Sequence, residues 1–124
     1  MKIMVVDDSR MIQSLVAETL SYKGIEVIAA DHGQHAVDLI AEHSDIDLIL
    51  LDWNMPVMDG PGFLDHVREN SLTSCPIVMM TTENKPEFIQ TAIDKGAVEY
   101  IMKPFTDDVL FGKIEMVTGV SYAV

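Results

Sequence analysis

The sequence predicts an α/β fold, a doubly wound five-stranded parallel sheet with helices on both faces. Short apolar runs of strand length alternate five times with segments in which apolar residues recur every three or four positions, the period of a helix face. The strand segments are apolar almost throughout rather than at alternate residues, which is typical of strands covered on both faces.

The expected strands share β-branched or long apolar side chains and end at a polar residue. They are residues 3–6, 27–30, 48–51, 77–80 and 100–102. The expected helices share an apolar stripe at helical spacing. Its members are Met11, Ile12, Leu15, Val16 and Leu20; Ala36, Val37, Ile40 and Ala41; Phe63, Leu64 and Val67; Phe88, Ile89, Ala92 and Ile93; and Leu110, Ile114 and Val117.

Capping residues support the boundaries of these helices. Gly24 is the expected C-cap of the first helix, and Asn84 is the expected N-cap of the fourth, with Pro86 in its first turn. Thr106 is the expected N-cap of the last helix. Gly112 lies inside that helix and costs about 1 kcal/mol relative to alanine, so packing must stabilise it.

Composition excludes several classes of function. Twenty acidic residues against eight basic ones give a net charge of -12, which argues against binding to nucleic acid or to an anionic membrane surface. A hydrophobic content of 48% over 124 residues indicates one folded domain rather than a disordered acidic tail. The single cysteine, Cys75, fits a reducing compartment and is expected to be a small buried apolar residue. With no signal peptide or membrane span in the sequence, we expect a cytoplasmic protein.

Polar residues follow four of the five expected strands. Asp7 and Asp8 follow the first, Asp52 the third, Thr81 the fourth and Lys103 the fifth. Ligands of doubly wound sheets bind outside the carboxyl ends of the strands, so these side chains are expected to converge. Asp7 or Asp8 alone would be more typical of a helix N-cap, and Lys103 alone of a surface lysine, but their joint placement favours a site.

Three carboxylates in one pocket require a cation. Like charges about 5 Å apart repel by roughly 3 kcal/mol at an effective dielectric constant of 20. Oxygen ligands with room for water suit Mg²⁺, or Mn²⁺, better than zinc. With the metal and Lys103 the pocket would be neutral, so it could accept a phosphoryl group, and Asp52 could act as the nucleophile.

Four motifs carry a resemblance to a known family: VVDDSR, LDWNMPVMDG around Asp52, MMTTE and YIMKPF. In their order and spacing they make the sequence similar, over nearly its whole length, to the receiver domain of two-component response regulators. The stand-alone chemotaxis regulators of that family are the most similar. The resemblance implies a flavodoxin-like (βα)5 fold and a single receiver domain over 1–124 with no output domain.

The resemblance implies a role for each matching residue. Asp52 would be the phosphoacceptor, Asp8 a direct Mg²⁺ ligand, and Asp7 a ligand largely through water. Asn54 would bind the metal through its backbone carbonyl, and Lys103 would contact the phosphoryl group.

The resemblance also implies a conformational switch. The Thr81 hydroxyl would move to the phosphoryl group and the Tyr100 ring would rotate inward, while the Lys103–Pro104 peptide would be cis. Thr82 departs from the small residue usual in the family, and Glu83 is typical of chemotaxis regulators.

The function expected from these observations is a phosphorylation-activated signalling switch rather than a conventional enzyme, because the protein would catalyse only its own phosphorylation and dephosphorylation. The resemblance implies a histidine kinase as phosphodonor, an effector such as a flagellar motor switch component, and a phosphatase as a further partner. We expect a monomer. A phosphate sink or phosphorelay receiver without its own effector, and a receiver excised from a larger regulator, remain alternatives.

The histidines are assigned no part in this chemistry. His32 and His35, three residues apart, are expected to be solvated loop residues because no third ligand lies near them in the sequence.

Overall fold

The computed structural model describes residues 1–82 and 84–120. Its strands are β1 (Lys2–Val6), β2 (Glu26–Ala30), β3 (Leu48–Asp52), β4 (Ile77–Thr81) and β5 (Glu99–Met102). Its helices are α1 (Arg10–Ser21), α2 (Gly33–Glu42), α3 (Gly60–Asn70), α4 (Pro86–Asp94) and α5 (Asp107–Thr118). The predicted alternation of strand and helix is confirmed.

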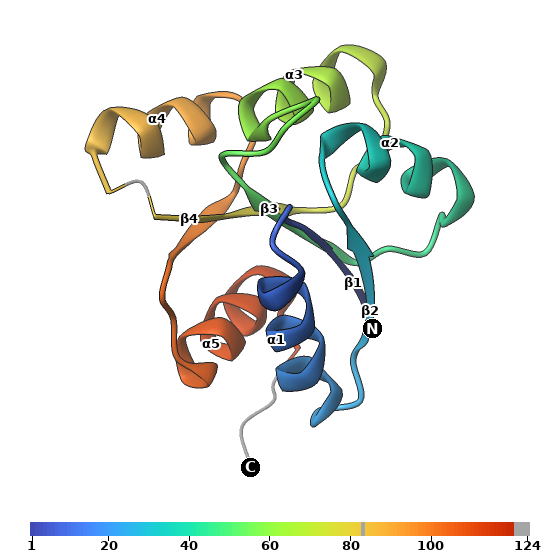
Figure 1. The fold of residues 1–124 in the computed structure, drawn as a ribbon, viewed down its shortest axis with the longest axis vertical. Helices are drawn as coiled ribbons and strands as arrows, with labels where there is room; N and C mark the ends of the chain where they lie inside the picture. The colour runs from blue at the N-terminus through green and yellow to red at the C-terminus, as the bar shows by residue number, and fades with distance from the viewer. Residues whose placement is uncertain (83, 121–124) are drawn as a thin grey trace.

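The five strands form one parallel sheet in the order β2-β1-β3-β4-β5. Figure 1 shows α2, α3 and α4 on one face of this sheet and α1 and α5 on the other. The chain reverses its direction of travel across the sheet after β2, so β1 and β3 lie side by side in the centre. A reversal of this kind is where doubly wound folds bind ligands.

Each face of the sheet has its own apolar core. Met4, Ile49 and Met79 point toward α2, α3 and α4, where Phe63 is fully buried. Alternate residues of the same strands, such as Ile3 and Leu50, point toward α1 and α5. Both sets are almost completely excluded from solvent, which explains why the strands are apolar at nearly every position.

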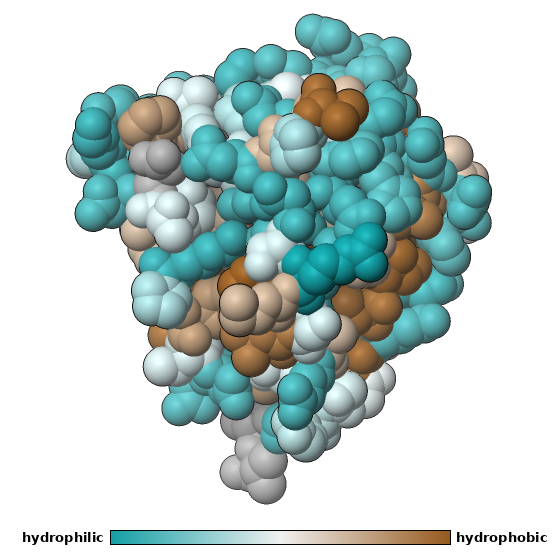
Figure 2. Space-filling view, in the orientation of Figure 1, coloured by the Kyte–Doolittle hydropathy of each residue, from teal (hydrophilic) through white to brown (hydrophobic). Residues whose placement is uncertain are grey.

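The surface is largely polar, as the charge balance predicts. The face in Figure 2 is mostly hydrophilic, and its apolar patches gather in the half where Figure 1 places α1 and α5. Exposed apolar side chains of these helices include Met11, Leu15 and Met116. None of the helices within the described residues is long and apolar enough to cross a membrane.

Two capping predictions are wrong and one is confirmed. The N-cap of α4 is Lys85, with no side-chain hydrogen bond, so Asn84 lies one residue too early to cap this helix. The C-cap of α1 is Tyr22, and Gly24 instead takes the positive φ of +72° that closes the following turn. Thr106 does cap α5, because its hydroxyl accepts a hydrogen bond from the backbone N–H of Val109.

The prediction that His32 and His35 are solvated loop residues is also wrong. His32 is the N-cap of α2, and its Nδ1 accepts the backbone N–H of His35 at 3.1 Å. The Nδ1 of His35 in turn accepts the backbone N–H of Asp31 at 3.0 Å. An imidazole nitrogen can replace the usual hydroxyl or carboxylate acceptor at a helix start, and the sequence spacing alone does not show this.

Candidate functional site

The carboxyl ends of β1, β3, β4 and β5 bring the predicted site residues together. In the β1–β3 pair Val6 is opposite Leu51, so Asp7, which follows β1, and Asp52, the last residue of β3, lie at the same level. In the β4–β5 pair Thr81 is opposite Met102, so Lys103 follows directly beyond that pair. This convergence follows from the parallel register and confirms the expected placement.

Asp7, Asp8 and Asp52 form an acidic cluster. One carboxylate oxygen of each lies within 4.8 Å of the others. Asp7 is 1% exposed and Asp52 8% exposed, whereas Asp8 is open to solvent. A buried carboxylate costs free energy unless it is paired, so two of the three need partners inside the protein.

Lys103 is that partner. Its Nζ donates to Oδ2 of Asp7 at 2.6 Å and to Oδ1 of Asp52 at 3.3 Å. The Lys103–Pro104 peptide is cis, as the family resemblance implies. The ammonium group therefore neutralises one of the two buried negative charges, and the cluster as a whole stays negative.

The electrostatics of Asp52 reflect this imbalance. Burial raises the pKa of its carboxyl above the ordinary value, and the negative charge of Asp7 raises it further. The Lys103 ammonium and the backbone N–H of Trp53, which donates to Oδ1 at 2.9 Å, oppose this shift. An additional positive charge at the site would stabilise the ionised form of Asp52.

The donor set fits a hard divalent cation. Mg²⁺ binds oxygens at about 2.1 Å, so opposite ligands of one ion lie about 4.2 Å apart. The 4.8 Å limit on the three carboxylate oxygens is close to this span and leaves space for water ligands. Asp7, Asp8 and Asp52 are the residues that would hold such an ion.

The loop after β3 is shaped around the backbone of Asp52. A Cβ added at Gly60 would lie 2.6 Å from the carbonyl oxygen of Asp52, so only glycine allows this close approach. Asp59 caps α3 by accepting the backbone N–H of Gly62. The sequence Asp-Gly at 59–60 is thus explained by the turn that returns the chain over the end of β3.

A narrow apolar cavity lies behind Thr81. Its lining residues come from the ends of β3, β4, β5 and from α4: Trp53, Met79, Thr81, Phe88, Ile89, Ala92 and Tyr100. Thr81 is buried, and Tyr100 is half-buried with the Lys113 ammonium 5.2 Å from its ring centre. Trp53 contacts Phe88 edge to face at 5.3 Å. The two predicted switch residues therefore line one cavity.

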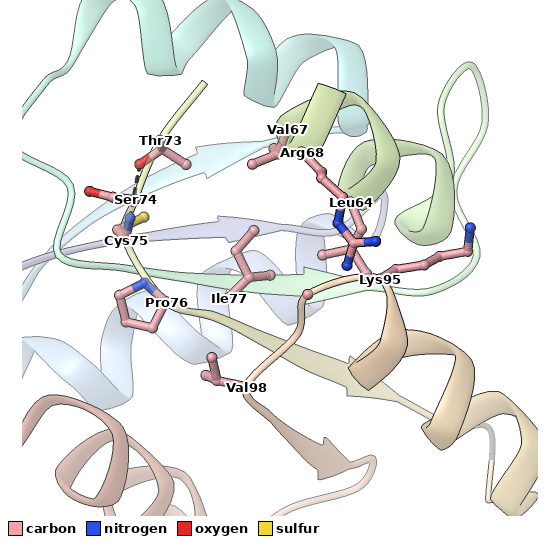
Figure 3. A pocket seen from close by; sticks show the side chains of 11 residues that line it. Leu64, Val67, Arg68, Thr73, Ser74, Cys75, Pro76, Ile77, Lys95 and Val98 are labelled. Atoms are coloured by element: carbon pink, nitrogen blue, oxygen red, sulfur yellow. Dashed lines mark hydrogen bonds between the residues drawn. The ribbon is translucent and has the colours of Figure 1, made fainter. Parts of the chain in front are cut away.

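A larger cavity, about 310 Å³, lies away from this site at the amino end of β4 (Figure 3). Its two cations already have partners: Arg68 donates to the carbonyl oxygen of Asp94 at 2.5 Å, and Lys95 binds both carboxylate oxygens of Asp65 at 2.9 Å. These bonds join the end of α4 to α3. Cys75 lines the same cavity, and burial raises the pKa of its thiol, as expected for an unreactive cysteine.

One site residue was not found from the sequence, and the roles predicted for the site residues stay predictions. Gln13 of α1 is buried and donates to the backbone carbonyl of Asp7. No sequence motif marks a single glutamine in a helix as part of a site, so the sequence did not predict this contact. Asn54 is exposed in the loop after Asp52, and its role as a carbonyl ligand stays a prediction. Glu83 lies outside the described residues.

A doubly wound parallel sheet with three carboxylates and a lysine at the carboxyl edge of its strands defines the class of protein. The family model of the response regulator receiver domain matches residues 3–115, so the chain belongs to that family of two-component signalling proteins.

The chain is similar in sequence and structure to chemotaxis regulators of this family. The chain is 40% identical to a chemotaxis protein CheY homolog of Campylobacter jejuni, with 96% of this chain and 93% of the relative covered. It is also 40% identical to the chemotaxis protein CheY1 of Helicobacter pylori, covering 96% and 98% respectively. Among solved structures, Vibrio cholerae chemotaxis protein CheY4 is 38% identical over 94% of this chain and 97% of that one, with a TM-score of 0.86.

Proposed function

We propose that this protein is a phosphorylation-activated switch in which Asp52 accepts a phosphoryl group. The observation that carries the proposal is the convergence of Asp7, Asp8 and Asp52 within 4.8 Å, with Lys103 bound to two of them. Such a pocket is too negative to receive a phosphoryl group by itself. It becomes neutral when a divalent cation is added to the lysine charge.

The proposed reaction is transfer from a phosphohistidine of a kinase. A carboxylate oxygen of Asp52 forms a bond to phosphorus as the P–N bond of the donor breaks, and the electron pair of that bond returns to the imidazole nitrogen. Asp52 is suited to this role because Lys103 and the Trp53 backbone N–H fix its Oδ1, which leaves Oδ2 as the attacking atom.

Asp7, Asp8 and Asp52, with the carbonyl of Asn54, would hold Mg²⁺, or Mn²⁺ in its place. When bound, the cation neutralises negative charge on the transferring phosphoryl oxygens. Lys103 is within reach of the same oxygens because it already bridges Asp7 and Asp52. Phosphorylation would exchange part of that bridge for a bond to the phosphoryl group.

The output of the switch is proposed to be a change in protein affinity. Thr81 would hydrogen-bond to the phosphoryl group, and Tyr100 would move within the cavity that both residues line. The surface of α4, β5 and α5 would then change shape. It carries Lys85 and Lys113, of which Lys113 is bound to Glu99 at 3.2 Å, so an acidic or amphipathic partner segment would suit it.

The partners are proposed by analogy with the relatives. A histidine kinase would supply the phosphoryl group, an effector such as a flagellar motor switch component would read the activated state, and a phosphatase would end the signal. We place this monomeric signalling protein in the cytoplasm, in control of chemotaxis. A phosphate sink without an effector is the second candidate, and the near-complete coverage of the named chemotaxis regulators favours the first.

The test is labelling by a small phosphodonor with Mg²⁺. Wild type should gain one phosphoryl mass that is labile to base, and Asp52→Asn should gain none. Asp59→Asn is the matched control, since it changes an exposed carboxylate seven residues later, and it should label normally. Labelling of Asp52→Asn at the wild-type level would refute the assignment. Beryllofluoride-dependent capture of a partner would separate a switch from a sink.

A further inference from the structure

Gln13 is a buried polar residue of α1 that contacts the acidic cluster through the backbone of Asp7. It lies in the first turns of α1 with 8% of its surface exposed. Its Nε2 donates to the backbone carbonyl of Asp7 at 2.7 Å and to Oδ1 of Asp31 at 2.9 Å, and it lies 3.4 Å from the carbonyl of Ala30. One side-chain amide thus joins the ends of β1 and β2.

The orientation of this amide is fixed by its surroundings. All three neighbours of Nε2 are oxygen atoms, so the reversed amide would place oxygen against oxygen. Asp31 strengthens the arrangement: the hydrogen bond from Gln13 is the main cause that lowers the pKa of Asp31, and Arg10 lies 3.3 Å from the other carboxylate oxygen. The amide nitrogen is held toward Asp7.

The Asp7 carbonyl belongs to the peptide unit that also contains the backbone nitrogen of Asp8. Because a peptide unit is planar, fixing its oxygen sets the direction in which the chain leaves Asp7. Both the backbone and the side chain of Asp7 are held in place. Its backbone N–H donates to the carbonyl oxygen of Ala30, and its Oδ2 accepts from the Lys103 ammonium. Asp8 has an exposed side chain, so the direction of this peptide unit determines where its carboxylate lies.

We propose that Gln13 is a positioning residue for divalent metal binding, acting by orienting the Asp7–Asp8 peptide so that the Asp8 carboxylate faces the ion. This inference rests on the proposed metal site. Groups that orient metal ligands from outside the coordination shell typically change metal affinity 10–100-fold when they are replaced. Gln13 adds no charge, so its contribution is geometric.

The experiment is a Mg²⁺ titration followed by Trp53 fluorescence. Gln13→Met keeps the side-chain length and removes the donor, and it should weaken binding about tenfold. Gln90→Met is the matched control, because Gln90 also donates to a carboxylate, that of Asp94 at 2.7 Å, but on exposed α4. This control should bind Mg²⁺ as wild type does. Amide resonances of Asp8 and Ser9 should shift in metal-free Gln13→Met, which a global loss of stability would not produce selectively.

Gln13→Glu separates geometry from charge. Its added negative charge would tighten Mg²⁺ binding if attraction alone mattered, whereas a carboxylate cannot donate to the Asp7 carbonyl, so we expect weaker binding. Asp31→Ala and Asp31→Asn form a second pair on a half-exposed residue, in case Gln13 variants fail to fold. Both remove the same charge, and only alanine removes the acceptor, so alanine should weaken binding more.

The outcomes distinguish this inference from the proposed function. If Asp8→Ala weakens Mg²⁺ binding while folded Gln13→Met and Gln13→Glu bind as tightly as wild type, Gln13 is not a positioning residue. Equal effects of the two Asp31 variants would count against it in the same way. If Asp8→Ala itself leaves the titration unchanged, the metal site is wrong.

Discussion

The substitution Asp52→Asn should stabilise the metal-free protein, although it removes the proposed acceptor. Asp52 is buried beside Asp7, and both effects raise its pKa. A group whose pKa is raised on folding binds protons more readily in the folded state, so its ionisation lowers stability as the pH rises. Asparagine keeps an oxygen that can accept from Lys103 and Trp53 but carries no charge.

The size of the effect can be worked out from the distances. The carboxylate oxygens of Asp7, Asp8 and Asp52 lie within 4.8 Å of one another, and at an effective dielectric constant of 20 two like charges at that limit repel by about 3.5 kcal/mol. At the same dielectric constant, the Lys103 ammonium, 3.3 Å from Oδ1 of Asp52, attracts this carboxylate by about 5 kcal/mol. The two repulsions together exceed this attraction by about 2 kcal/mol. Solvent screening of the exposed Asp8 lowers that difference and the burial of Asp52 adds to it, so we expect a net gain of about 1–2 kcal/mol.

The assay is thermal unfolding in EDTA, repeated over a range of pH. At pH 7.5 Asp52→Asn should be more stable than wild type, with a Tm about 4–8 °C higher. The gain should shrink as the pH falls through the raised pKa of folded Asp52 and disappear below 3.8, where wild-type Asp52 is protonated in both the folded and the unfolded state. Asp38→Asn, an exposed carboxylate, controls for net charge and should change little. A less stable Asp52→Asn at pH 7.5 would refute the reasoning.

Three further predictions concern other parts of the structure. Lys103→Met should lose about 2–3 kcal/mol of stability in EDTA, because two buried carboxylates lose their partner, and Mg²⁺ should restore more stability to it than to wild type. Thr106→Ala should cost about 1 kcal/mol in urea unfolding, because the cap of α5 is lost, whereas Asn84→Ala should stay within about 0.5 kcal/mol; equal losses would contradict the capping assignment. Cys75 should react with a thiol reagent at pH 8 more slowly than a free thiol and recover the free rate in urea, since burial raises its pKa; a fast reaction in the folded protein would count against this.

The fold and the centre of the site could be predicted from sequence because both depend on chain order. Alternating strand and helix patterns allow few arrangements, and in a parallel sheet every strand presents its carboxyl end to the same edge. Asp7 and Lys103 follow strands directly and Asp52 is the last residue of β3, so their meeting requires no knowledge of side-chain packing. Thr81 ends β4 and is placed by the same rule.

The remaining features depend on contacts between segments that the sequence pattern does not link. Gln13 contacts Asp7 and Asp31 because α1 packs beside β2. A glutamine in a helical sequence pattern does not by itself indicate which segment it will contact. His32 caps α2 through a ring nitrogen, an uncommon substitute for the usual acceptors. Asn84 has a favourable side chain for a cap, but the chain enters α4 one residue later.

All the side chains assigned to the chemistry lie at one edge of the sheet, so the turns at the other edge are open to protein engineering. In the turn after α1, a Cβ added at Gly24 would have no atom within 4 Å, so an insertion beside this glycine meets open space, while the φ of +72° requires the glycine itself to be kept. A circularly permuted fluorescent protein inserted there would be joined directly to α1, the helix that carries Gln13. If metal binding shifts α1, the fluorescence of this fusion would change on addition of Mg²⁺, while the residues that would bind the metal remain unaltered.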